Sequence, residues 1–213
     1  MLEQLDSIDW ASLGHAYGSA ADVPHQLRSL LSDDEEIRQK ALEELFGNIY
    51  HQGTVYEASI YAIPFLIEFL DDPNYQAKDD IVQLFACIAG GKGYLEVHAV
   101  DDQGQIDWNE ISAGHGRSLN EEIQKETKVI KMVRAASSPH VPRLLPYLAH
   151  GEPDMREVIA VMLTYFPEHF EMAIPALETA TSIEIDEDVQ EYMQSALEYM
   201  RAARDKMKKC DRL

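Results

Sequence analysis

The feature that most constrains the fold is a proline that recurs four times after a β-branched residue. Each proline opens an apolar helical stretch, which is followed by an acidic turn and a second amphipathic helix. The four dipeptides are Val23-Pro24, Ile63-Pro64, Val141-Pro142 and Ile174-Pro175. Position +21 after each proline holds Leu45, Phe85, Leu163 and Ala196. Agreement at several distances from a repeated residue indicates an internal repeat of helix pairs.

The spacing of the prolines also suggests how the chain is divided. A chain of 213 residues suits a short stack of repeats, and a hydrophobic content of 46% suffices for a continuous core. We therefore expect a single α-solenoid domain over 1–213. Its expected parts are an N-terminal cap (1–22), repeat 1 (23–52), repeat 2 (53–91), an insertion plus a degenerate repeat (92–138), repeat 3 (139–168) and repeat 4 (169–209).

Local signals place several helix ends. A short helix is expected over Trp10–Tyr17, and its apolar residues Trp10, Leu13 and Tyr17 would cover the open end of the first repeat. Another helix is expected from Val55 to Leu70 with Pro64 in its interior. The last helix is expected to bury an apolar stripe: Val189, Tyr192, Met193, Ala196, Leu197 and Met200. Asp72-Pro73 is expected to restart the chain as a cap followed by a first-turn proline. Capping boxes, in which a hydroxyl and a carboxylate satisfy free amides reciprocally, are predicted at Ser32-Asp33-Asp34-Glu35, Thr54-Val55-Tyr56-Glu57 and Ser118-Leu119-Asn120-Glu121.

The helical period breaks in the insertion at 91–117. Tyr94–Val100 alternates loosely and Ile106–Trp108 can return after a turn, which predicts a β-hairpin or an ordered loop. Two roles remain open for it. It can protrude and contact a partner through Tyr94 and Trp108, or it can simply cover the core.

The helix-pair segments resemble HEAT repeats. The matching residues are Pro24 to Leu31, followed after an acidic turn by Arg38-Gln39-Lys40-Ala41-Leu42. His15-Ala16-Tyr17-Gly18 and His51-Gln52-Gly53-Thr54-Val55-Tyr56 also resemble segments of small bacterial HEAT-repeat proteins of unassigned function. The resemblance implies an all-α fold, a HEAT-like right-handed α-α superhelix or solenoid, here with a short β-hairpin or loop insertion. It also implies binding of macromolecules, without naming a partner.

Charge narrows the class of partner. The chain has 38 acidic and 18 basic residues, a net charge of −20. Such a field repels phosphate backbones, so we expect no nucleic-acid binding, and it attracts basic proteins. The N-terminal residues do not form a signal peptide and no run of about 18 apolar residues is present, so we expect no membrane contact and a cytoplasmic protein.

The HEAT resemblance implies that the second helix of each pair lines a concave face. Aligned positions on these helices are mainly acidic or amide residues, and they form the predicted partner-binding face: Glu36, Gln39, Glu43, Gln76, Asp79, Gln83, Asp154, Glu157, Glu187 and Gln190. An acidic groove that holds a basic segment of another protein is one interpretation. An ordinary solvated helix face is the other.

A second set of residues lies near repeat boundaries. It combines histidines, tyrosines and an amide as a secondary contact site, extended by the two aromatic residues of the insertion: His15, Tyr17, His51, Gln52, Tyr56, Tyr94 and Trp108. Histidines in such places can equally be hydrogen-bonded packing residues. Arg38 and Arg156 recur at one repeat position, which favours a structural role, such as pairing with the inter-helix Asp or with carbonyl groups of the neighbouring repeat.

The sequence shows no catalytic or metal-binding motif. It contains no GxSxG, P-loop, GxGxxG, HxxxH or HExxH pattern, and neither Cys87 nor Cys210 has a CxxC partner. We therefore expect no cofactor, no metal and no catalytic residue. The favoured function is a non-catalytic protein-protein interaction module, either an acidic adaptor or an immunity-type inhibitor that binds a basic partner. The alternative is a HEAT-like enzyme acting on nucleic acid or a small cofactor.

Overall fold

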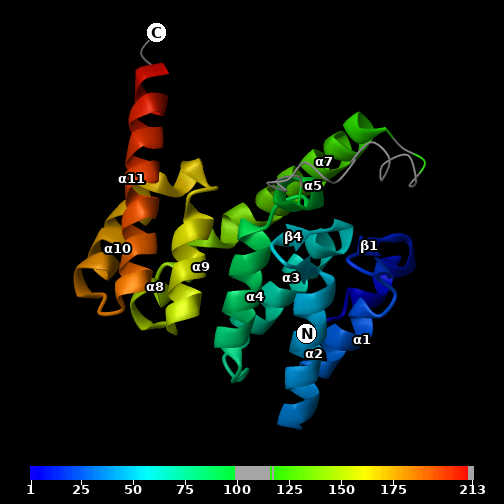
Figure 1. The fold of residues 1–213 in the computed structure, drawn as a ribbon. Helices are drawn as coiled ribbons and strands as arrows, with labels where there is room; N and C mark the ends of the chain where they lie inside the picture. Colours follow the sequence, from blue (N-terminus) through cyan, green and yellow to red (C-terminus); the bar gives the residue numbers. More distant parts are fainter. Residues whose placement is uncertain (99–115, 117, 211–213) are drawn as a thin grey trace. The chain divides into compact units, whose positions relative to one another are not determined.

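Helices make up most of the described chain, as the repeat pattern predicts (Figure 1). The computed structural model describes residues 1–98, 116 and 118–210. The chain divides into two units: unit 1 is Met1–Asp72 with Gly91–Ala136, and unit 2 is Pro73–Gly90 with Ser137–Leu213. The described residues also form two small antiparallel sheets, which the all-α prediction lacked. The superhelical arrangement of the repeats remains a prediction.

Unit 1 consists of helices of different lengths and two β-hairpins. Its elements are η1 (Leu5–Ser7), η2 (Trp10–Ser12), β1 (Gly14–His15), β2 (Gly18–Ser19), α1 (Val23–Ser29), α2 (Glu35–Asn48), β3 (Tyr50–His51), β4 (Thr54–Val55), α3 (Glu57–Asp71), α5 (Tyr94–His98) and most of α7 (Leu119–Ser137). Helix α1 packs on α2, β1 packs against α3, and α5 packs against β4.

Each hairpin has residues of positive φ either in its turn or directly after it. In the second hairpin Gln52 and Gly53 have φ of 48° and 90°, as a two-residue turn between right-twisted strands requires. In the first hairpin Gly18 has φ of 120°. The prediction of a helix over Trp10–Tyr17 is therefore wrong, because the chain turns into β1 after η2.

Trp10 is nevertheless a core residue of unit 1. Its side chain is buried, its indole Nε1 donates to the Leu5 carbonyl at 2.9 Å, and its ring lies 6.2 Å from that of Phe65. Leu13 is partly buried, whereas Tyr17 is 70% exposed. Of the three residues expected to cap the first repeat, Trp10 alone is fully in the core.

Unit 2 is built from two helix pairs and an additional helix. Its elements are α4 (Lys78–Gly90), η3 (Ser138–Leu144), α8 (Tyr147–His150), α9 (Pro153–Leu163), η4 (Pro167–His169), α10 (Phe170–Ile183) and α11 (Glu187–Cys210). Helix α9 contacts α4, α8 and α11, and α10 contacts α11. A Cβ on Gly90 would lie 3.4 Å from Met162, so this glycine allows α4 and α9 to approach closely.

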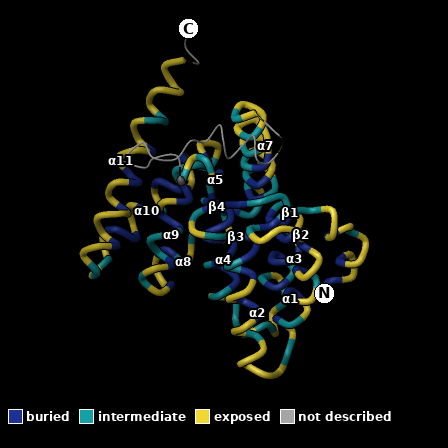
Figure 2. The backbone as a smooth tube through the Cα atoms, turned by 45° about the vertical axis from the view of Figure 1, so that its right-hand side comes forward, coloured by how far each residue is buried: buried dark blue, intermediate teal, exposed yellow. Residues whose placement is uncertain are grey.

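The apolar stripe of the last helix is largely confirmed. Val189, Met193, Ala196, Leu197 and Met200 are buried, and most of the helix beyond Met200 is exposed (Figure 2). The predicted stripe also included Tyr192, which is 46% exposed.

Capping is correct at one predicted position and shifted at two. Ser118 and Glu121 form the predicted box: the Ser118 N–H donates to Glu121 Oε2 at 2.7 Å, and the Glu121 N–H donates to Ser118 Oγ at 3.3 Å. Helix α2 is instead capped by Asp34, which accepts from the Glu36 N–H at 2.9 Å. At α3 the Ser59 hydroxyl accepts from the Tyr56 N–H at 2.8 Å, because Thr54 belongs to β4.

Two further predictions fail near the boundaries of the second repeat. Asp72-Pro73 does not begin a helix, since α4 starts only at Lys78. Tyr94–His98 is helix α5, not a strand. The rest of the predicted hairpin, including Ile106–Trp108, lies outside the described residues.

Candidate functional site

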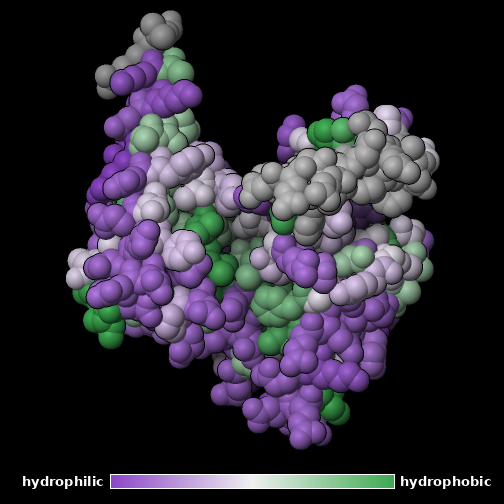
Figure 3. All heavy atoms as spheres, in the orientation of Figure 1, coloured by the Kyte–Doolittle hydropathy of each residue, from purple (hydrophilic) through white to green (hydrophobic). Residues whose placement is uncertain are grey.

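Most residues of the predicted acidic face are exposed. On α2, Glu36, Gln39 and Glu43 all point to solvent, and hydrophilic residues cover α2 and α11 in the view of Figure 3. In unit 2, Asp79, Asp154, Glu187 and Gln190 are exposed, whereas Gln83 and Glu157 are partly buried. Gln76 precedes α4 and donates to the Asn74 carbonyl, so it does not belong to a second helix as predicted.

Within unit 2, the adjacent helices α9 and α11 enclose an acidic cleft of about 420 Å³. Its lining residues, here called the α9–α11 cleft, are Glu157, Asp188, Glu191, Tyr192 and Ser195. Burial raises the pKa of the Glu157 carboxyl, and the negative charges of Asp154, Asp188 and Asp186 raise it further. Of the predicted face, Glu157 is the residue that lines this cleft.

The secondary set of unit 1 forms two groups that share His15. His15, Tyr17 and His51 form an aromatic row along the two hairpins: ring centroids are 6.4 Å apart for His15 and Tyr17, and 5.3 Å for Tyr17 and His51. The Tyr17 hydroxyl lies 3.5 Å from His51 Nδ1. Gln52 occupies the turn beside them. Trp108 lies outside the described residues.

His15 is held by hydrogen bonds on both ring nitrogens. Its Nδ1 accepts from the Tyr17 N–H at 3.0 Å, so Nε2 carries the proton and donates to Asp22 at 3.0 Å. The Asp22 carboxylate also accepts from Gln26 Nε2 and Asn48 Nδ2, each at 3.0 Å. Asp22 thereby joins the first hairpin to α1 and α2. The packing interpretation of His15 accounts for these contacts.

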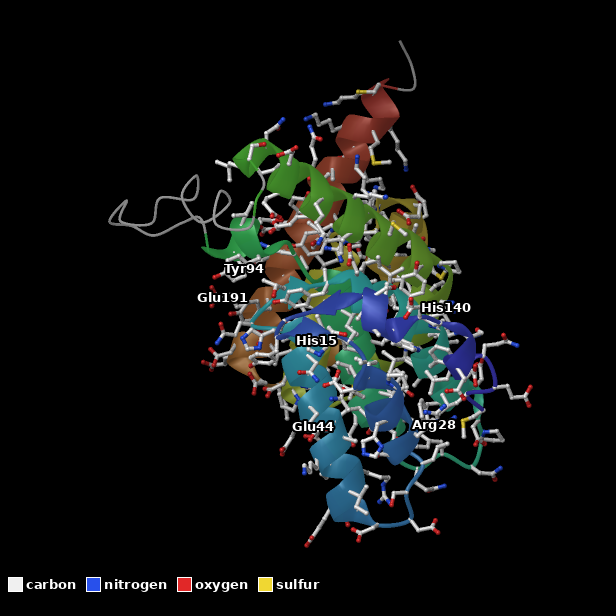
Figure 4. The ribbon with its side chains drawn as sticks, turned by 90° about the vertical axis from the view of Figure 1, so that its right-hand side faces the viewer. His15, Arg28, Glu44, Tyr94, His140 and Glu191 are labelled. Atoms are coloured by element: carbon white, nitrogen blue, oxygen red, sulfur yellow. The ribbon has the colours of Figure 1, made fainter. Side chains whose placement is uncertain are left out.

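The second group lines a cavity of about 230 Å³ in unit 1, here called the unit 1 cavity. Three predicted residues, His15, Tyr56 and Tyr94, are among its walls; the whole lining is Gly14, His15, Val55, Tyr56, Glu57, Tyr94, Glu122, Lys125, Glu126 and Val129. Figure 4 labels His15 on the first hairpin and Tyr94 on α5. The sequence alone predicted His15, Tyr56 and Tyr94 as members of one set, but it did not predict that residues of α7 lie beside them.

One face of α7 supplies four of the walls. Glu122, Lys125, Glu126 and Val129 are spaced i, i+3, i+4 and i+7, which places them on a single helix face. That spacing is visible in the sequence and could have indicated a shared surface. The residues that face it across the cavity come from distant segments, which the sequence does not reveal.

Hydrogen bonds fix the polar groups of the cavity. Glu126 accepts from the Leu95 N–H at 3.0 Å, and burial raises the pKa of its carboxyl, with Glu122 and Glu96 adding to the increase. Burial also raises the pKa of the Tyr56 phenol, whose oxygen lies 2.6 Å from Thr54 Oγ1.

Glu57 is the other well-placed carboxylate of this cavity. Lys125 Nζ lies 3.6 Å from Glu57 Oε1, and the Gly14 N–H donates to Glu57 Oε2 at 3.3 Å. The first hairpin, α3 and α7 therefore meet at this carboxylate.

Arg38 and Arg156 behave as structural residues. Arg38 donates to the Ser32 carbonyl at 2.7 Å, and Arg156 donates to the Gly151 carbonyl, each in the loop that precedes its own helix. Arg156 also forms a bidentate pair with Glu184, at 2.7 and 2.8 Å. The partners differ from the predicted ones: the carbonyls lie in the loop before each arginine's own helix, and the inter-helix acid is a glutamate, Glu184.

The part of the chain that the structure describes shows neither a metal-binding cluster nor a membrane-spanning helix. Among the described residues, no group of three or more His, Cys, Asp or Glu side chains is arranged to hold a metal ion. No described helix is both long and apolar enough to cross a membrane. In comparisons with known proteins, the chain matches no family model and no curated protein. The HEAT resemblance therefore rests on the sequence motifs themselves.

Proposed function

We propose that this protein is a non-catalytic protein-binding module of the α-solenoid type, and that it binds a basic surface of its partner. The observation that carries the proposal is the α9–α11 cleft. Two neighbouring helices hold Glu157, Asp188 and Glu191 around one depression, in a chain of net charge −20.

The charge of the cleft favours a cationic occupant. The raised pKa of Glu157 means that its ionised form is disfavoured by burial and by neighbouring carboxylates. A lysine or arginine side chain placed there would remove part of that repulsion. Tyr192, which is 46% exposed at the same cleft, supplies an aromatic surface on which a cation or an aliphatic stem can pack.

The partner's chemistry follows from this arrangement. A basic segment or a basic protein surface gains from long-range attraction, which accelerates association at low salt, and from desolvated charge pairs in the cleft. An acidic adaptor or an immunity-type inhibitor would use such a surface in the same way. Neither role requires a catalytic group.

The test is capture of partners from a native extract by tagged protein, with mass spectrometry of the bound fraction. We expect one or a few basic proteins, lost when Glu157 and Glu191 are both changed to lysine. Glu198→Lys is the matched control, because Glu198 is exposed on α11 and lies outside the cleft lining. Retention of the same partners by the double variant would reject the cleft, and capture of only acidic proteins would reject the proposal.

A further inference from the structure

The unit 1 cavity has the shape of a site for a single small group. Its volume of about 230 Å³ is below the roughly 300–1,000 Å³ of pockets for drug-sized ligands. Its walls come from the first hairpin, from β4 and the start of α3, from α5 and from α7. They are tied together by the bonds from Gly14 to Glu57 and from Leu95 to Glu126.

Charge in this cavity favours a cation. Three glutamates and one lysine line it, and the lysine, Lys125, lies beside Glu57. Glu122 and Glu126 are spaced i, i+4 on α7, an arrangement in which like charges repel. A bound cation would relieve that repulsion, whereas an anion would increase it.

Aromatic rings favour an organic cation over a metal ion. Tyr56 and Tyr94 both line the cavity, and a ring face attracts an ammonium or guanidinium group. Val55 and Val129, both buried, supply apolar wall for an alkyl stem. Carboxylates, tyrosine rings and valine methyl groups together match a charged head on a short aliphatic chain.

We propose that the unit 1 cavity binds one alkylammonium or guanidinium group, with its charge against Glu122 and Glu126 and its stem against Tyr56, Tyr94 and Val129. The group can be the side chain of a polypeptide or a free amine. This inference goes beyond the proposed function, because it concerns a different unit and requires no protein partner in the α9–α11 cleft.

Gly93 leaves room beside its backbone for the Glu126 carboxylate. A Cβ at Gly93 would collide with the Glu126 carboxylate, so a side chain there would push Glu126 away from the Leu95 N–H. The Leu95 N–H therefore holds the carboxylate in space that a glycine at position 93 leaves open. A positioned carboxylate loses less entropy on binding a cation than a freely rotating one.

The experiment is a methyl NMR titration of the whole chain, observing Val55 and Val129. The probes are n-butylammonium and n-propylguanidinium, and n-butanol is the neutral control of similar size. We expect saturable shifts of both valines with the cations and none that saturate with n-butanol. Equal responses to n-butanol, or no saturation by either cation up to about 50 mM, would overturn the proposal.

Two variants locate the effect. Glu126→Gln keeps an oxygen that can accept from the Leu95 N–H but removes the charge, and we expect it to weaken cation binding by about tenfold. Glu44→Gln, on the exposed face of α2, is the matched control and should leave the affinity unchanged. Unchanged affinity in Glu126→Gln would contradict the proposal. If that variant fails to fold, Tyr94→Ala at a 45% exposed position replaces it, with an expected loss of about threefold.

Blocked tripeptides distinguish the two sources of the cation. Gly-Lys-Gly and Gly-Arg-Gly with capped termini are titrated beside Gly-norleucine-Gly. Tighter binding of the basic peptides than of the free cations would assign the site to a polypeptide side chain. Saturation by the free cations alone would assign it to a small amine. Because the readout is at Val55 and Val129, failure here leaves the test of the α9–α11 cleft unaffected.

Discussion

The two units use their polar side chains differently, although both are built from helices of the same repeat pattern. In unit 1, Asp22 and Glu126 hold loops, hairpins and helices together through hydrogen bonds to neighbouring segments. In unit 2, one buried ion pair, Arg156 with Glu184, connects successive helix pairs. Hydrogen bonds to neighbouring segments therefore join the elements of unit 1, whereas a buried ion pair joins the helix pairs of unit 2.

Arg38 and Arg156 allow the two units to be compared directly, because they occupy the same position after the repeated proline. Arg156→Ala should lower the free energy of unfolding by about 3 kcal/mol, because it leaves Glu184, whose side chain is only 3% exposed, without its bidentate partner. Arg38→Ala should cost only about 1 kcal/mol, the value of a single hydrogen bond to a carbonyl. Chemical denaturation of both variants measures the difference. Equal losses would show that the ion pair adds nothing to the shared carbonyl bond.

Asp22 provides the corresponding test in unit 1. Asp22→Ala should lower the free energy of unfolding by about 2 kcal/mol, because His15, Gln26 and Asn48 all lose the acceptor of a buried donor. Asp33→Ala is the control, since Asp33 is exposed beside α2. A loss no greater than in the control would mean that water replaces the carboxylate at no cost.

Replacement of Gly93 and of Gly47 by alanine should change the free energy of unfolding in opposite directions. Gly93→Ala should destabilise unit 1 by about 1–2 kcal/mol, because its Cβ would collide with Glu126. Gly47→Ala should stabilise the protein by about 0.5–1 kcal/mol, because Gly47 lies in α2 with open space around its Cβ position. Thermal melts of the two variants test this. Destabilisation of both would indicate that helix propensity does not govern Gly47.

Glu184 and Glu126 should make the free energy of unfolding depend on pH in opposite directions. Hydrogen bonding to Arg156 lowers the pKa of Glu184, so its contribution is present above the ordinary glutamate pKa and is lost as pH falls through the lower folded value. Burial raises the pKa of Glu126, so its contribution is present below the ordinary value and is lost as pH rises through the higher folded value.

Melting curves of Glu184→Gln and Glu126→Gln between about pH 3 and 7 measure these contributions. Relative to the natural chain, Glu184→Gln should be most damaging at the upper end of that range and least at the lower end. Glu126→Gln should show the reverse trend, since its amide stays neutral where the carboxyl must ionise. Around Glu126 the charged or titratable groups are Glu122 and Lys125 on α7, Tyr94 and Glu96 on α5, and Tyr56, Glu57 and His15. Parallel trends in the two variants would contradict the opposite shifts.

Sequence reasoning succeeds where the determinant is local. The reciprocal bonds of Ser118 and Glu121 depend on four adjacent residues, and the buried stripe of α11 depends on helical period alone. It fails at Trp10–Tyr17 and at Thr54, where glycines in or next to the turns allow hairpins to form from segments that also carry helix signals. Short strands of two residues have no period to detect.

The same difference between local determinants and long-range packing applies to the candidate sites. Glu157 was singled out by its repeat position, and the structure places it in the lining of the α9–α11 cleft. Glu57 and Glu126 were missed, because their proximity depends on how α3, α5 and α7 pack around the first hairpin. Tyr94 was singled out as an exposed contact residue of the insertion, and the structure places it on a helix at the rim of a cavity.

Binding of a basic partner at the α9–α11 cleft can be tested by hydrogen–deuterium exchange with a captured partner. We expect the partner to protect peptides spanning 154–163 of α9 and 187–198 of α11, and we expect no such protection in the Glu157→Lys, Glu191→Lys variant. Unchanged exchange across both helices, with protection confined to other segments, would contradict binding at the α9–α11 cleft.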